Sequence, residues 1–165
     1  MQKRLYLLCP TDCLETVINN RFKDENYFYS SLGNSFHVED NTVDSIRKII
    51  KTHDINEVSF VLSNRNHIVK DALGTQDFIQ LRGLSCLYHQ ISTQKKYSDI
   101  FWKTDYNQFS VLSYYLNTKI IELQLELGRI NMGSIVINGK IYDRLTNNFK
   151  TIHPNLLCFK KCHLN

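Results

Sequence analysis

The chain has 165 residues, of which 42% are hydrophobic and 22% are charged, and its formal net charge at pH 7 is +4. These values are typical of a globular domain, and a chain of this length buries enough surface to fold without disulfides or metals. The apolar runs are too short to cross a membrane, and the scattered lysines and arginines form no basic stripe, which excludes nucleic acid as an expected partner.

The first stretch, "MQKRLYLLCP", begins with basic residues and continues with a short apolar segment. That segment is too short for a secretion signal and instead predicts a strand over 4–9. The chain has five cysteines, an odd number. Without a signal for export, reduced thiols in the cytoplasm are expected rather than a disulfide framework.

Three runs in the first half of the chain predict strands. They are "RLYLLC" (4–9), the aromatic-rich "NYFYSSLGN" (26–34) and "EVSFVL" (57–62). Pro10 closes the first run because proline cannot donate to a strand ladder. Gly33 suits a loop after the second.

A segment with apolar residues at helical spacing follows each of these strands. The predicted helices are 13–22, 41–54 and 66–73. Asp12, Thr42 and Asn64 are their expected N-caps, because a short polar side chain can accept a hydrogen bond from a free amide of the first turn.

The second half is predicted to be helical before a final hairpin. Residues 75–92 are expected to form a helix that is broken or kinked near Gly83, and residues 105–128 form one long helix. The dipeptide Asn138-Gly139 is expected to turn between strands at 135–137 and 140–142, and a short strand at 149–152 follows.

This order of elements predicts an α/β fold. A central, mostly parallel sheet is expected, with helices on both faces and a hairpin or edge strand at the C-terminus. No repeat or linker divides the chain, so one domain over 1–154 and a tail over 155–165 are expected. Cys158, Cys162 and His163 resemble part of a metal site, but their terminal position favours a tail or a subunit-contacting arm.

Four of these segments together resemble the β-class carbonic anhydrases. That family has a strand ending C-x-D-S-R, an aromatic strand ending R-N-A-G-N, an apolar strand ending G-H-x-x-C-G, and a last strand of the form G-x-x-Y-D. Here their places are taken by "YLLCPTDC", "YFYSSLGN", "FVLSNRNHI" and "IVINGKIYDRLTNNFKTI". The resemblance covers most of the chain and implies the family's α/β fold, a zinc site and a homodimer.

The resemblance places only part of the family's zinc site in this chain. Cys9 takes the place of the first ligand, Asn64 that of the histidine and His67 that of the second cysteine. Asp12 and Cys13 stand where the family has serine and arginine, so its aspartate–arginine pair is missing from this motif.

Two further family positions survive at the predicted cleft. Gly33 and Asn34 match the end of R-N-A-G-N, while Ser30 replaces its arginine. Together with Asn64 they are the expected cleft residues.

Zinc-dependent hydration of carbon dioxide needs three protein ligands and an open position for water. Cys9 and His67 are competent ligands, whereas the neutral amide of Asn64 is a weak one. Cys13 or Asp12 would have to supply the third ligand, and Asp12 is also the candidate catalytic group. Each residue has a structural alternative as well: Cys9 as a core residue, His67 on the surface, and Asn64 and Asp12 as caps.

Two functions remain open, and a third is weaker. The favoured one is a carbonic-anhydrase-like protein with a degenerate zinc site, a pseudoenzyme that binds a small anion or a partner in the vacated cleft. The alternative is a zinc-dependent lyase or hydrolase with altered ligation through Cys9 and His67. A redox pair of Cys9 and Cys13 is disfavoured because C-x3-C lacks the tight C-x-x-C geometry that activates a thiol.

Overall fold

The structure, a computed structural model, describes residues 2–35, 41–81, 83–101, 106–129 and 134–152. Its centre is a five-stranded sheet in the order β2-β1-β3-β4-β5. The strands are β1 (Lys3–Leu8), β2 (Glu25–Ser30), β3 (Glu57–Ser63), β4 (Val136–Asp143) and β5 (Asn148–Thr151). β1 to β4 run parallel, and β5 pairs antiparallel with β4 at one edge.

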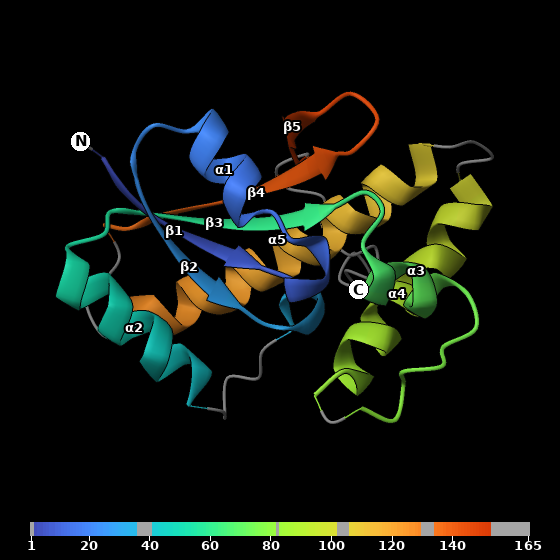
Figure 1. Cartoon of the computed structure of the whole chain (residues 1–165). Helices are drawn as coiled ribbons and strands as arrows, with labels where there is room; N and C mark the ends of the chain where they lie inside the picture. Colours follow the sequence, from blue (N-terminus) through green and yellow to red (C-terminus); the bar gives the residue numbers. More distant parts are fainter. Residues whose placement is uncertain (1, 36–40, 82, 102–105, 130–133, 153–165) are drawn as a thin grey trace.

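Helices cover both faces of this sheet (Figure 1). They are α1 (Glu15–Arg21), α2 (Thr42–His53), α3 (His67–Leu73), α4 (Ser85–Phe101) and α5 (Tyr106–Gly128), with short 3-10 turns at Pro10–Asp12 and Leu32–Asn34. The expected α/β fold, with a mostly parallel sheet and an edge strand at its C-terminal side, is confirmed. No helix in these ranges is long and apolar enough to span a membrane.

Alternating side chains of β1 show how the two faces are filled. Leu5 and Leu7 point into the larger core, to which α2, α3, α4 and α5 all contribute. Tyr6 and Leu8 point the other way, into a smaller core closed by α1 through Ile18. A strand buried on both faces must be apolar at nearly every position, which explains the run that predicted β1.

The predicted turn at Asn138-Gly139 is wrong. Both residues lie within β4, which pairs with β3 from Val136 to Tyr142. Packing favours glycine here, because a Cβ atom on Gly139 would lie 2.6 Å from Ile152 Cδ1 and 3.2 Å from Ile120 Cδ1, and these side chains would have to shift. The hairpin turn falls later, between β4 and β5.

The predicted N-caps are also corrected. Leu14 precedes α1 and Asn41 precedes α2, while Asp12 is buried in the 3-10 turn. Asn66, and not Asn64, caps α3, with its side chain accepting a hydrogen bond from Val69 N at 3.0 Å. The helix expected over 75–92 begins only at Ser85, after Gly83 with its positive φ, and α4 then continues to Phe101.

The carboxyl ends of the parallel strands meet at one edge of the sheet, close to the start of α3 (Figure 1). Ser31 N donates to Leu8 O at 2.9 Å, which joins the ends of β1 and β2. Asn64 N donates to Tyr142 O at 2.9 Å and joins the ends of β3 and β4. Ligands of open α/β sheets bind outside the carboxyl ends of the strands, which makes this edge the expected place for a site.

Replacing Gly33 with alanine should destabilise the fold, because Gly33 lies in the 3-10 turn after β2, at the carboxyl ends of the strands. Gly33 has φ +61°, and an added Cβ would lie 2.4 Å from Leu87 Cδ1. We expect the free energy of unfolding in urea to fall by about 2–4 kcal/mol, from backbone strain and overpacking together.

Gly83→Ala is the matched control for Gly33→Ala. Gly83 also has a positive φ, +87°, but nothing lies within 4 Å of a Cβ placed there. The control should lose only about 1 kcal/mol from the backbone term. Equal losses in the two variants would contradict the packing argument.

Candidate functional site

Cys9 forms the floor of the site, directly after β1. Its side chain is 1% exposed. Its Sγ lies 3.0 Å from Thr11 Oγ1 and accepts a hydrogen bond from Gly33 N at 3.1 Å. The left-handed backbone of Gly33 brings this amide onto the sulfur, so the thiol is held in a closed local network.

Asp12 is the buried carboxylate of the site, with 1% of its surface exposed. Its Oδ2 accepts hydrogen bonds from Ser63 N and Asn66 Nδ2, both at 2.9 Å. Its Oδ1 has no hydrogen-bond partner among the described residues. Burial raises the pKa of the Asp12 carboxyl, and the hydrogen bonds from Ser63 and Asn66 oppose that rise.

Arg144 reaches the same place from the turn after β4. Its Nε donates to Ser63 Oγ at 3.0 Å, and its Nη2 donates to the backbone oxygen of Asp12. The same Nη2 lies 3.9 Å from Asp12 Oδ1, which is an ion pair too long for a hydrogen bond. An aspartate–arginine pair is therefore present, although the C-x-D-S-R motif does not supply it.

The side chain of Asn64 hydrogen-bonds to the turn after β4 and does not lie beside Cys9 beneath the pocket. Its Nδ2 donates to Asp143 Oδ1 at 3.0 Å, and its Oδ1 accepts from Arg144 N at 3.2 Å. Its backbone oxygen accepts from Gln108 Nε2 at 2.6 Å. Asn66 reaches the floor in its place, with Nδ2 3.3 Å from Thr11 Oγ1.

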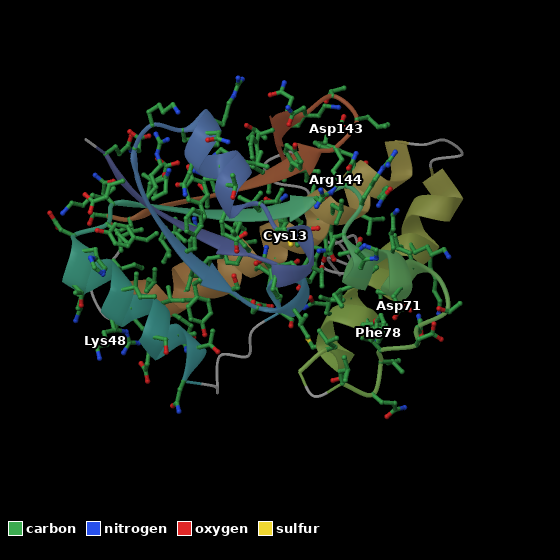
Figure 2. All side chains as sticks on the ribbon, in the orientation of Figure 1. Cys13, Lys48, Asp71, Phe78, Asp143 and Arg144 are labelled. Atoms are coloured by element: carbon green, nitrogen blue, oxygen red, sulfur yellow. The ribbon has the colours of Figure 1, made fainter. Side chains whose placement is uncertain are left out.

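A pocket of about 540 Å³ opens above these residues. It is lined by Thr11, Asp12, Cys13, Arg65, His67, Lys70 and Arg144. Figure 2 labels Cys13 and Arg144, which come from segments far apart in the sequence. The lining combines three permanent cations and a histidine with a single carboxylate.

The cations of the pocket are only partly compensated. Arg65, His67 and Lys70 are exposed, and across the ranges described no carboxylate forms an ion pair with Arg65 or Lys70. Arg144 is 38% exposed at its side chain and shares the buried Asp12. Positive charge in a concave site attracts anions, and arginine matches the geometry of an oxyanion.

The predicted site residues are thus only partly brought together. Asp12, Cys13 and His67 line the pocket, and Cys9 lies buried beneath it. Asn34 is buried, with Nδ2 donating to Val61 O at 2.9 Å.

Two other expectations concern the cysteines and the tail. Cys9 and Cys13 are both free thiols, and Cys13 Sγ donates to Pro10 O at 3.5 Å. Cys158, Cys162 and His163 lie outside the described residues.

The residues at this site do not fit a zinc ion. Within the described parts of the chain, no group of three histidine, cysteine, aspartate or glutamate side chains could hold a metal. Cys9 is already bonded to Thr11 and Gly33, and His67 is exposed at the first residue of α3. A tetrahedral site needs three protein ligands besides water, and the described residues offer no third ligand grouped with Cys9 and His67.

Sequence reasoning missed the residues that give the pocket its charge. Arg65 and Lys70 flank His67 in "NRNHIVK", and this cluster of bases was the available signal. Arg144 directly follows the Tyr-Asp motif of β4, but nothing local showed that it would fold back onto Asp12.

Comparison with known proteins gives matches to solved structures alone. No family model matches the chain, and no curated protein matches it. The β-carbonic anhydrase CafD of Aspergillus fumigatus superposes with a TM-score of 0.73 at 17% identity, over 93% of this chain and 90% of that one.

Other solved structures agree. A structure from a study of two tetrameric β-carbonic anhydrases of Sordaria macrospora superposes with a TM-score of 0.68 at 14% identity, over 95% of this chain and 81% of that one. The Coccomyxa enzyme in complex with acetazolamide matches with TM-score 0.67 and 12% identity, over 91% and 71% of the two chains. The chain therefore has the fold of the β-carbonic anhydrases.

Proposed function

We propose that this protein is a carbonic-anhydrase-like pseudoenzyme that binds a small oxyanion in the pocket at the ends of β1 and β3. The observation that supports this most directly is the lining of the pocket: Arg65, Lys70 and Arg144 face one space, and Asp12 is the only carboxylate that the described residues contribute to it. Arg65 and Lys70 are exposed, and three cations around one concave space create a positive potential that attracts anions. An oxyanion bound there accepts several charge-assisted hydrogen bonds.

The residues beneath the pocket give little support to carbon dioxide hydration. Hydration needs a metal-bound water that loses its proton near neutral pH. Cys9 keeps its thiol in contact with Thr11 and Gly33, and the amide of Asn64 is used by Asp143 and Arg144. The alternative zinc enzyme with Cys9 and His67 as ligands would need a third ligand, and among the described residues no group of three histidine, cysteine, aspartate or glutamate side chains could hold a metal.

Metal content and hydration activity test the first part of the proposal. Protein purified after growth with added zinc should contain far less than one zinc per chain, and stopped-flow hydration of carbon dioxide should stay at the uncatalysed rate. Both are expected because only two ligand types remain at the family's three ligand positions. One zinc per chain that is lost in Cys9→Ala and in His67→Ala would overturn it.

Loss of one basic side chain tests the oxyanion site. In Lys70→Gln, the affinity for sulfate or phosphate should fall about tenfold, because a charge-assisted contact is removed. Arg65→Gln should act alike. The measurement is isothermal titration calorimetry at constant ionic strength, since salt screens such contacts.

Lys48→Gln is the matched control. Lys48 is an exposed lysine on α2, away from the pocket (Figure 2). The overall charge changes by the same amount, but anion affinity should not change. An equal loss in all three variants would mean that only net charge attracts the anion.

We also propose that the protein is a homodimer. The Sordaria structures are tetrameric, and α5 carries two apolar residues one turn apart, Ile121 and Leu125, which are 45% and 60% exposed. Light scattering after gel filtration should give twice the mass of the chain, and Leu125→Glu should shift the protein to monomer. Leu145→Glu, at a residue 75% exposed in the β4–β5 turn, is the control. A monomeric parent protein would refute the proposal.

A further inference from the structure

The Oδ1 atom of Asp12 is an unused acceptor at the floor of the pocket. The residue is 1% exposed, and Oδ2 already accepts two hydrogen bonds, while Oδ1 accepts none from the described residues. A buried carboxylate oxygen without a donor is unfavourable, so such an atom calls for an explanation.

Arg144 is the nearest cation, yet it does not satisfy this oxygen. Its Nε and Nη2 donate to Ser63 Oγ and to the backbone oxygen of Asp12. The distance from Nη2 to Oδ1 is 3.9 Å. Asp12 and Arg144 both line the pocket, and the Arg144 side chain is 38% exposed, so an anion bound there would contact this guanidinium beside Oδ1.

We infer that the pocket selects an oxyanion that still carries a proton, hydrogen phosphate, over one that carries none, sulfate. This rests on the proposed function, since it names the ligand of the same pocket. The hydroxyl group of hydrogen phosphate donates to Asp12 Oδ1, and its other oxygens accept from Arg65, Lys70 and Arg144. Near neutral pH sulfate has lost both protons, so it places a bare oxygen against a carboxylate.

The chemistry of the lining makes this discrimination large. Asp12 is held in place by Ser63 N and Asn66 Nδ2, so it cannot turn away from the ligand. With sulfate, a negatively charged oxygen lies against the Asp12 carboxylate. With hydrogen phosphate, a hydroxyl group donates a hydrogen bond to that carboxylate instead, which corresponds to a preference for phosphate of about tenfold or more. Burial also raises the pKa of Asp12, as expected of a carboxylate that lacks a donor on one oxygen.

Comparing methyl phosphate with inorganic phosphate tests whether the pocket binds free phosphate or an esterified phosphate group. Near pH 7.5 a monoester has mostly lost its last proton, because the second pKa is about 6. Methyl phosphate should therefore bind more weakly than inorganic phosphate at that pH. Binding as tight as that of inorganic phosphate would overturn the inference.

The main test is titration calorimetry of the full chain at pH 7.5 with sodium phosphate and sodium sulfate at matched ionic strength. The wild-type protein should bind phosphate about tenfold more tightly or better. In Asp12→Asn, the ratio of the two affinities should fall to about one, because the amide can donate to a sulfate oxygen. Asp44→Asn, an exposed carboxylate on α2, should keep the wild-type ratio.

If Asp12→Asn does not fold, the affinities of the wild-type protein for arsenate and selenate provide the same test without a variant. Arsenate keeps a proton near neutral pH and should bind like phosphate, whereas selenate should bind like sulfate. Equal binding of all four anions, or an unchanged ratio in a folded Asp12→Asn, would overturn this inference and leave the proposed oxyanion site standing. Binding of none of them would overturn both.

Discussion

The carboxylate of Asp12 holds the site end of the molecule together. Through one oxygen it joins the turn after β1 to Ser63 N at the end of β3 and to Asn66 at the start of α3. Asn66 in turn caps α3, because its side-chain oxygen Oδ1 accepts a hydrogen bond from Val69 N. Two strands and a helix thus depend on one buried anion, which is stable there only because it has these donors.

This anion also sets the electrostatics of the pocket. A single buried negative charge binds Arg144 across the sheet, while Arg65 and Lys70 have no carboxylate partner in the described part of the chain. The polar side chains around Asp12 form hydrogen bonds with one another, and the charge that remains on the lining of the pocket is positive.

Much of the fold could be predicted because its signals are local and strong. The apolar runs of β1 and β3 and the long periodic pattern of α5 follow directly from burial on two faces or one. The prediction of a turn at Asn138-Gly139 was wrong because this dipeptide is a local hairpin signal. In the structure the glycine lies within β4 and leaves room for the side chain of Ile152, which lies outside that strand. Tertiary packing decided that position.

The candidate site was predicted less well for the same reason. Spacing from the next helix favoured Asp12 as a cap, but the 3-10 turn after Pro10 directs its side chain inward. The contact of Arg144 with Asp12 joins residues 132 apart in sequence and depends on the register of the β4–β5 turn. The local patterns in the sequence did not show which distant residue Arg144 would contact.

That register has a mechanical consequence for the edge of the sheet. Asp143 binds Asn64 with one oxygen and Lys150 of β5 with the other, at 3.0 and 2.9 Å. A slip of β5 by a single residue would send Lys150 to the opposite side and loosen the anchor just before Arg144. The short strand β5 therefore stabilises the site from a distance, because its correct pairing with β4 holds Arg144 beside Asp12.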